Sequence, residues 1–265
     1  MDSFASFRAL IIAALAAFPA LPMAAEQLRV CADPENAPFT NRAETGFSNQ
    51  IAERLADEMG RELTYHWREL GVGFLRQTLQ AGACDVVMDY AADDWRVLNT
   101  AAYYRSSFVI AVRRGDDLLG VTSLTDPRLA GRRIGVVAGG PPAAHLARLG
   151  MIGDARPYPL TVDRKLESPA TIMLADLNAG EIDAAILWGP LAGAEIAADQ
   201  NLNAEILASN DLPPPLVYEM TLAVRPGDEA LKVELEAALL AAGPEIEAIL
   251  RAADVPFIPF GAPTQ

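Results

Sequence analysis

The sequence predicts a two-lobed α/β protein in which each lobe is a mostly parallel sheet flanked by helices. Short apolar runs alternate along the chain with segments whose apolar residues recur at helical spacing, which is the pattern of βαβ units. This pattern runs through the first third of the chain and restarts near residue 132. Two pairs of similar segments, with one member of each pair in either half, favour two lobes of similar construction.

The first lobe is predicted to begin with a strand at residues 28–32. A helix follows, because Ile51, Leu55 and Met59 recur at helical spacing and Gly60 provides an end. The remaining elements expected in this lobe are a strand at residues 62–67, a helix at 73–82 that ends at Gly82, and a strand at 84–88.

The second lobe is predicted to begin with a strand that runs into the glycine-rich turn of residues 132–140. Pro141 and Pro142 can open a helix that ends near Gly150, since proline suits the first helical positions. A helix at residues 169–179 and a buried strand at 184–188 complete the pattern. Gly189 and Pro190 then predict a turn that leads away from the strand.

Two pairs of similar segments, called here the sequence echoes, relate the two halves of the chain. "LQAGACDVVM" at 79–88 and "LNAGEIDAAI" at 177–186 share Leu-x-Ala-Gly-x-x-Asp before an apolar strand, and 108–116 and 220–228 both end in Ala-Val-Arg-x-Gly-Asp. Because the second pair brackets the second lobe, these strands are interpreted as a double-strand hinge. The predicted division is a first lobe at 26–113 and 217–265, and a second lobe at 114–216.

The N-terminus has the pattern of a secretory signal peptide. Arg8 precedes ten apolar residues at 9–18, and small residues at 23–25 follow two prolines. The apolar stretch is too short to cross a bilayer. We therefore expect a signal peptide at residues 1–25 and an exported, soluble chain from Glu26, with no membrane insertion.

The composition limits the partners. The 265 residues are 51% hydrophobic, and 21 Lys and Arg stand against 35 Asp and Glu, a formal net charge of −14. An acidic surface disfavours binding to nucleic acid and to anionic membranes. It suits a basic protein partner, or it keeps the chain soluble.

Two cysteines, Cys31 and Cys84, occur in the chain. In an oxidising compartment they most simply form one disulfide, which would stabilise the fold by about 4 kcal/mol on the chain-entropy model. Two free buried thiols are the alternative.

The chain resembles type II periplasmic solute-binding proteins of amino-acid transporters, on residues 46–60, "LTYHW", "TLQAGACDVVM" and 221–250. Its segments "RVCADPENAPFTN", "CDVVM", "YYRSSFV", "PPAAHLARLGMI" and "EIDAAILWGPLAG" are similar to a narrower branch, the MxaJ/XoxJ-like quinoprotein dehydrogenase-associated proteins. The resemblance implies the two-lobed periplasmic binding protein fold and a location in the periplasm. It also implies association with a PQQ-dependent alcohol dehydrogenase of the methanol type or its c-type cytochrome.

A cleft between the lobes is the predicted site, because ligands of open α/β sheets bind beyond the carboxyl ends of the strands. The side chains and backbone expected there lie at predicted strand ends or adjoining loops: Asp33, Asn36, Pro38, Phe39, Asp89, Tyr90, Arg96, Tyr104, Arg105, Gly139, Gly140, Pro141 and Trp188. The turn at Gly139 and Gly140 can expose backbone amides at a helix start, where an anion binds.

Enzymatic chemistry is not predicted. His66 and His145 fall in different lobes, and no Gly-x-Ser-x-Gly, His-Glu-x-x-His or Cys-x-x-Cys occurs. No cofactor and no metal site is expected, and the acidic loop at 89–94 lacks the pattern of a calcium loop. Asp33 and Asp89 are the residues a lyase of this fold would use, but binding or turn roles are preferred.

Recognition of a free amino acid is also disfavoured. The resemblance implies an arginine after the third strand for the α-carboxylate, and Arg96 lies there in an altered context. An acidic residue is implied where Trp188 stands, and an indole meets an ammonium group only by cation–π contact. The sequence thus favours an accessory protein whose cleft binds the dehydrogenase or a related ligand. A substrate-binding protein of an ABC importer, serving its permease with a small polar solute such as an amino or organic acid, is the alternative.

Overall fold

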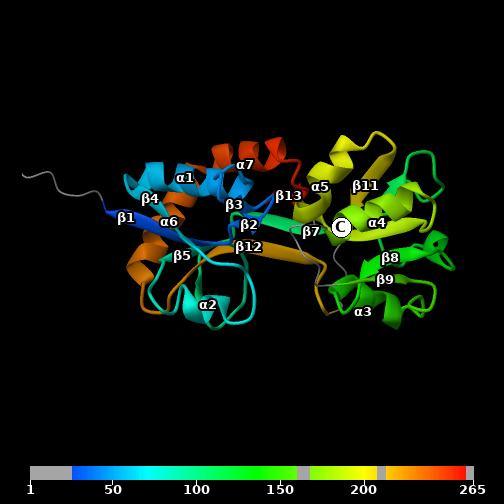
Figure 1. Ribbon diagram of the computed structural model, residues 1–265, viewed down its shortest axis with the longest axis horizontal. Coiled ribbons are helices and arrows are strands. Elements are labelled where there is room, and N and C mark those ends of the chain that lie inside the picture. The colour runs from blue at the N-terminus through cyan, green and yellow to red at the C-terminus, as the bar shows by residue number, and fades with distance from the viewer. Residues whose placement is uncertain (1–25, 160–167, 208–212, 261–265) are drawn as a thin grey trace, which may run out of the picture.

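The structure is a computed structural model that describes residues 26–159, 168–207 and 213–260. The predicted signal peptide at residues 1–25 lies outside the described residues. Two sheets, each flanked by helices, lie side by side and are joined by two long strands (Figure 1). The predicted two-lobed α/β fold with a double-strand hinge is confirmed.

The first sheet contains the N-terminal elements. Its strands β1, β4 and β5 are parallel, and β12 lies antiparallel to β5 and also pairs with the short β6. The bounds are β1 (Gln27–Ala32), β4 (Glu62–Trp67), β5 (Val86–Ala91), β6 (Leu98–Asn99) and β12 (Val217–Val224). A small hairpin of β2 (Glu35–Asn36) and β3 (Thr40–Asn41) follows β1.

The second sheet repeats this plan. Its strands β8, β9 and β10 are parallel, and β7 lies antiparallel to β10 and pairs on its other edge with β11. The bounds are β7 (Tyr104–Arg113), β8 (Ile134–Val137), β9 (Arg156–Tyr158), β10 (Ala184–Trp188) and β11 (Leu202–Ile206).

Strand β7 belongs to both sheets. Its first residues, 104–107, pair with β12 and with β13 (Phe257–Ile258), whereas 108–113 pair with β10 and β11. The chain thus leaves the first sheet between Ser107 and Phe108, and it returns through β12. The finer lobe boundaries at 113 and 216 stay a prediction.

Helices cover both faces of each sheet, as continuous apolar strands require. The helices of the first lobe are α1 (Phe47–Met59), α2 (Phe74–Gln77), α6 (Glu229–Ala241) and α7 (Gly243–Ala252). Those of the second are α3 (Pro141–Arg148), α4 (Pro169–Asn178) and α5 (Gly189–Ala198), with a 3₁₀ turn at Pro127–Leu129.

Alternation along the strands divides the core of the first lobe between the two faces. Val30 and Val86 pack in the cluster that contains α1, α6 and α7, whereas Cys31 and Val87 pack on the other face with Phe74 of α2. The same period of two operates in β10, where Ala185 and Leu187 pack on one face and Ala184 and Ile186 on the other.

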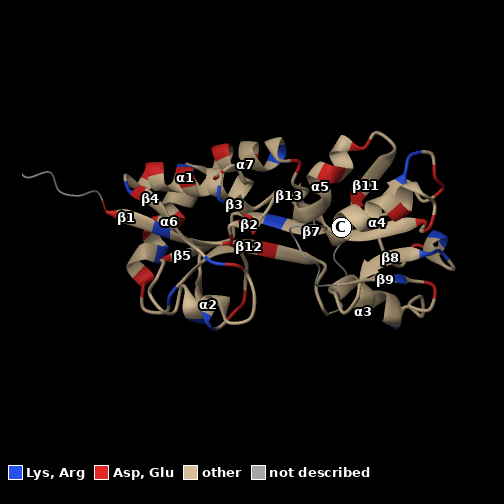
Figure 2. Ribbon diagram, in the orientation of Figure 1, with Lys and Arg blue, Asp and Glu red and all other residues tan. Residues whose placement is uncertain are grey.

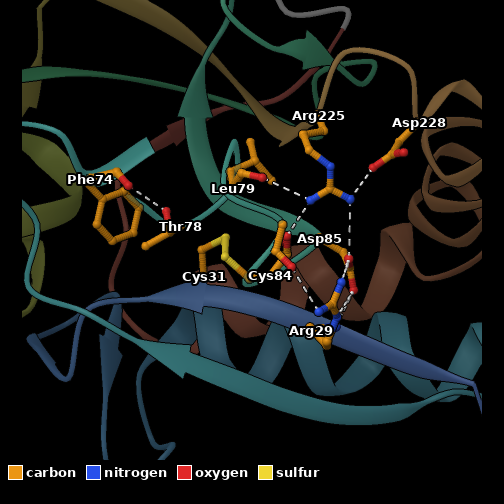
Figure 3. Close-up of a disulfide and its surroundings, with 10 residues drawn as sticks. Arg29, Cys31, Phe74, Thr78, Leu79, Cys84, Asp85, Arg225 and Asp228 are labelled. Carbon is orange, nitrogen blue, oxygen red and sulfur yellow. Dashed lines mark hydrogen bonds and ion pairs between the residues drawn. A yellow bond between two sulfur atoms is a disulfide. The ribbon is translucent and has the colours of Figure 1, made fainter. Parts of the chain in front are cut away.

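The two sequence echoes occupy equivalent places in the two lobes. In the first lobe, Arg225 at the end of β12 donates to the carbonyl oxygens of Leu79 and Cys84, at 3.0 and 2.8 Å, and pairs with Asp228 (Figure 3). In the second lobe, Arg113 makes the matching contacts: it donates to the carbonyl oxygens of Leu177 and Ile182, at 2.6 and 2.9 Å, and pairs with Asp116. Each Ala-Val-Arg-x-Gly-Asp strand therefore fastens the Leu-x-Ala-Gly-x-x-Asp turn of its own lobe.

The aspartates that close these turns also correspond. Asp85 accepts hydrogen bonds from the side chain of Arg29, and Asp183 accepts them from the side chain of Arg133. In each case the aspartate amide donates back to the carbonyl oxygen of the arginine, at 2.7 and 2.8 Å. The predicted likeness of the two lobes thus extends to individual hydrogen bonds.

Two predicted elements differ from the structure. The helix expected at 73–82 ends at Gln77, because the backbone of Thr78 leaves the helical region, with φ −120° and ψ −87°, and the chain continues as turns. The turn expected at Gly189 and Pro190 is instead the start of α5, since a proline in the first turn of a helix loses no hydrogen bond. The other predicted strands and helices are present with shifted ends.

Candidate functional site

A cavity of about 240 Å³ lies beyond the carboxyl ends of β1 and β5, where an α/β sheet is expected to bind its ligand. Most of its wall comes from the first lobe, and Trp188 at the end of β10 contributes from the second. The lining residues are Cys31, Ala32, Asp33, Asn36, Phe39, Thr40, Leu70, Phe74, Val87, Met88, Asp89, Tyr90, Trp188 and Met220. We call this space the interlobe cavity.

Six of the predicted site residues meet in the interlobe cavity: Asp33, Asn36, Phe39, Asp89, Tyr90 and Trp188. Their segments are far apart in sequence, and the parallel strands β1 and β5 bring the first five together. The structure thus places aromatic rings and two carboxylates around one space.

Asp89 is the most unusual of these residues. Its backbone has a φ of 50°, in the left-handed region, where aspartate is among the more tolerated residues. Its carboxylate accepts hydrogen bonds from the hydroxyls of Tyr103 and Tyr104, at 2.7 and 2.9 Å, and from the hydroxyl of Ser48 on α1. Three hydroxyl donors therefore fix the carboxylate of a residue that lines the cavity.

Burial dominates the electrostatics of this group. Desolvation raises the pKa of Asp89, although the hydrogen bonds from Ser48 and the two tyrosines oppose the shift. Desolvation also raises the pKa of Tyr103 and of Tyr104 well above the usual value for a phenol. Both tyrosines are therefore neutral hydrogen-bond donors at neutral pH.

Asp33 has a different role. It is buried, and its two carboxylate oxygens accept the backbone N–H groups of Glu35 and Leu70, each at 2.8 Å. It thereby fixes the loop after β4 and the hairpin after β1 around the cavity. Phe39 of that hairpin packs on Phe47 with a centroid separation of 4.9 Å.

Trp188 is the last residue of β10, directly before α5 begins at Gly189. Its ring meets Phe108 and Tyr218 edge to face, at 5.3 and 5.5 Å, and it packs against the core cluster of the first lobe. The indole of a second-lobe strand therefore closes a first-lobe cavity.

The glycines of α5 allow this close approach. A Cβ atom on Gly189 would lie 2.6 Å from the carbonyl oxygen of Ser107, where β7 crosses between the sheets. A Cβ on Gly193 would collide with the carbonyl oxygen of Asp254 and with Pro256. Only glycine fits at either position, so α5 rests directly on the chain that returns to the first lobe.

Arg96 lies outside the interlobe cavity. It is exposed and pairs with Asp94, from Nη2 to Oδ2 at 2.6 Å, while Tyr90 also donates to Asp94. This pairing holds the pKa of Asp94 far below its usual value. Arg96 lines a separate open groove with residues 89–95.

Tyr104 and Arg105 are also outside the cavity wall. Tyr104 is buried and acts through Asp89. Arg105 donates to the carbonyl oxygen of Pro259 at 2.8 Å, and its guanidinium lies 5.5 Å from the ring of Phe260.

The remaining predicted positions are not brought to the cavity. Pro38 uses its carbonyl oxygen to accept the amide of Phe47 at the start of α1. Gly139, Gly140 and Pro141 lie at the start of α3 beside β8, and none of them lines the cavity.

The disulfide lies in the core of the first lobe, next to the interlobe cavity. Cys31 and Cys84 are joined, with their Cα atoms 5.3 Å apart, and both are buried with Phe74 and Leu79 (Figure 3). The predicted disulfide is confirmed, and Cys31 also lines the cavity.

Several lining or supporting residues were not predicted. Ser48 holds Asp89, and Leu70, Phe74 and Met220 line the cavity. Tyr103, which also holds Asp89, was by contrast visible in the sequence as part of the Tyr103–Tyr104 pair at a predicted strand end. Ser48 gives no such signal, because its partner lies 41 residues away.

Within the described ranges, no group of three or more His, Cys, Asp and Glu side chains could hold a metal ion. No helix in those ranges is both long and apolar enough for a bilayer crossing.

The chain is similar to bacterial solute-binding proteins and, among them, to the MoxJ and XoxJ proteins. Residues 28–248 match the bacterial extracellular solute-binding proteins, family 3. Protein MoxJ of Methylorubrum extorquens is 32% identical over 88% of this chain and 82% of its own, and Protein MoxJ of Paracoccus denitrificans is 29% identical over 88% and 89%. The crystal structure of the periplasmic binding protein XoxJ from Methylobacterium extorquens covers 88% of this chain and 99% of its own, with 36% identity and a TM-score of 0.72.

Proposed function

Because the chain belongs to family 3 of the bacterial extracellular solute-binding proteins, we propose that it is a binding protein whose interlobe cavity takes part of an oxidation system rather than a transported nutrient. The system is a PQQ-dependent alcohol dehydrogenase of the methanol type with its c-type cytochrome. The protein assists this system in the periplasm and binds the dehydrogenase or a related ligand between its lobes.

Similarity to the MoxJ and XoxJ proteins supports the choice of system. The sequence resemblance to the quinoprotein dehydrogenase-associated branch indicates the same partner. The extracellular family and the signal-peptide pattern of residues 1–25 support export to the periplasm. The family is one of solute-binding proteins, which favours a role without catalysis.

One observation carries the argument against a free amino acid. Among the described residues that line the interlobe cavity, none is Lys, Arg or His. Burying the α-carboxylate of a zwitterion there would leave a charge unpaired, at a cost of several kcal/mol. Arg96, the predicted carboxylate partner, is bound to Asp94 outside the cavity.

A receptor that delivers a small polar solute to an ABC permease is the second candidate. The family match favours it, since this is a family of solute-binding proteins. Its solute would have to bind without a cationic side chain from the described wall.

The test is capture of partners from periplasmic extract of cells grown on an alcohol, with tagged protein as bait and mass spectrometry as readout. We expect specific recovery of a quinoprotein dehydrogenase or its cytochrome. Trp188→Ala should abolish recovery, because it removes the second-lobe wall of the cavity. Trp95→Ala is the matched control, since Trp95 is 90% exposed and lines only the neighbouring open grooves.

Thermal unfolding of both variants would check that each is folded. Failure to recover either protein, from cells shown to contain both, contradicts the accessory role. Tight binding of a free amino or organic acid by the purified protein would favour the receptor instead.

A further inference from the structure

Among the described residues that line the interlobe cavity, the charged ones are both acidic. Asp33 and Asp89 both line it, and the described part of its wall contributes no cationic side chain. Anions in a partly enclosed space repel a further anion and attract a cation. The occupant is therefore expected to supply positive charge.

Among the described residues, Asp89 has no counter-ion. Its hydrogen-bond donors are the neutral hydroxyls of Ser48, Tyr103 and Tyr104, and the described residues form no ion pair with it. Burial of a carboxylate without a cation is costly, and burial accordingly raises the pKa of Asp89. A cation that entered the cavity would relieve this cost.

Asp33 is already satisfied by backbone amides at both oxygens. It adds negative potential, but its geometry is committed to holding Glu35 and Leu70. Asp89 is consequently the carboxylate that a ligand would complete.

The rest of the wall suits an alkyl chain that ends in an ammonium group. Phe39, Phe74, Tyr90 and Trp188 supply aromatic surface, and Val87, Met88 and Met220 supply aliphatic surface. Aromatic faces attract a cation through the negative potential above the ring. The volume of about 240 Å³ is some eight times the share of one water in the liquid, about 30 Å³, so a chain of four or five heavy atoms fits.

We propose that the interlobe cavity binds an alkylammonium group, with the charge against Asp89 and the chain against Trp188 and its aromatic neighbours. This inference rests on the proposed function and names the chemistry that the cavity recognises. The group belongs either to a small free amine or to a lysine side chain of the protein partner, and the two sources share this chemistry.

Calorimetric titration of the purified protein tests the proposal with two pairs of probes. The first pair is n-butylammonium and its neutral counterpart n-butanol. The second is Nα-acetyl-lysine N-methylamide and its norleucine analogue, which present the same side chain with and without the charge. We expect at least one charged probe to bind about tenfold or more tightly than its neutral counterpart, a difference of about 1.4 kcal/mol.

Variants assign the binding to this cavity. Asp89→Asn should weaken binding of the charged probe about tenfold or more, while Asp93→Asn should change it less than about twofold. Asp93 is the matched control, because it is an exposed aspartate of the adjoining loop that does not line the cavity. Trp188→Leu, which keeps apolar volume, should weaken binding several-fold and serves if Asp89→Asn does not fold.

Each outcome decides the question. Selective binding of n-butylammonium alone identifies a free amine, and binding of the lysine probe, with or without n-butylammonium, identifies the side chain of a partner. Equal binding of charged and neutral probes, no binding of either, or binding that neither cavity variant weakens overturns the inference. Capture of the dehydrogenase without ammonium binding would overturn the inference alone. Ammonium binding without capture would overturn only the proposed function.

Discussion

Asp89 combines an unusual backbone conformation with a buried carboxylate that three hydroxyl groups bind. A left-handed backbone at φ 50° turns it toward three hydroxyl donors, and the two tyrosines that follow β6 supply two of them. Three neutral hydrogen bonds orient the carboxylate, and no cation among the described residues pairs with it. Burial raises the pKa of Asp89, so folding favours its protonated form.

This conclusion predicts a particular pH dependence. Folding raises the pKa of Asp89 above its ordinary value of 3.8, so its contribution to stability is complete below that pH and is lost as the pH rises through the raised pKa. The variant Asp89→Asn does not titrate there. We expect the free energy of unfolding of the parent, minus that of the variant, to fall as the pH rises from 3.8, by about 1.4 kcal/mol for each unit of pKa shift.

Urea unfolding of both proteins at a series of pH values gives this difference directly. Effects of other carboxylates cancel, because both proteins contain them. A difference that stays flat, or that grows with pH, would contradict a raised pKa at Asp89.

Glycine at two positions decides how closely the lobes approach. Gly189 and Gly193 lie one helical turn apart on α5 and face Ser107 and Asp254, where any side chain would displace backbone. The Trp-Gly-Pro corner therefore combines three functions: Trp188 closes the cavity, Gly189 admits the crossing strand, and Pro190 starts the helix.

At the level of elements, an arginine at the end of each crossing strand fastens a turn in each lobe. Arg225 and Arg113 each donate to two carbonyl oxygens and pair with an aspartate three residues on. Both side chains are largely buried, at 24% and 29% exposure. Removing either guanidinium would remove hydrogen bonds to two carbonyl oxygens, of which Leu79 and Leu177 keep the amides of Gly82 and Gly180 as donors.

We accordingly expect Arg225→Met and Arg113→Met to lower the free energy of unfolding by similar amounts, about 2–3 kcal/mol each. The exposed Arg251, which pairs with Glu247 on the surface of α7, is the control, and Arg251→Met should cost less than about 1 kcal/mol. Urea denaturation measures all three. If Arg225→Met and Arg251→Met were equally stable, the turn-fastening role would be wrong.

At the level of the whole molecule, the two lobes share structure instead of being joined by a flexible linker. Strand β7 contributes hydrogen bonds to both sheets, and the buried Ser107 donates to Leu207 and Leu216 at the crossing, at 2.8 and 3.0 Å. The lobes are therefore coupled through backbone and packing.

The charges do not separate the lobes. Acidic and basic residues are interspersed along the chain in both of them (Figure 2).

Because the two lobes are coupled, we expect the protein to unfold in a single thermal transition. Arg113→Met acts in the second lobe and Arg225→Met in the first, yet each should lower the midpoint of the same calorimetric transition. The calorimetric and van 't Hoff enthalpies should agree. Two separated transitions, one sensitive to each variant, would show that the lobes unfold independently.

Local patterns in the sequence were sufficient for the alternating strands and helices, because apolar periodicity reports which side of an element is buried. The pairing of Cys31 with Cys84 and the likeness of the two lobes also followed from residue identity and spacing alone. Five of the cavity residues, from Asp33 to Tyr90, could be anticipated, since parallel strands present their carboxyl ends at one edge.

The tertiary structure alone decided which candidates meet. Arg96 and Tyr104 lie near the same strand ends, but Arg96 turns outward to Asp94 whereas Tyr104 turns inward to Asp89. Gly139 to Pro141 were predicted at the cavity, yet the arrangement of the two lobes leaves them beside β8. These contacts depend on which way each side chain turns and on how the two lobes pack, and neither leaves a periodic trace in the sequence. Sequence therefore determined the elements and their faces, and packing across the crossing strands determined the site.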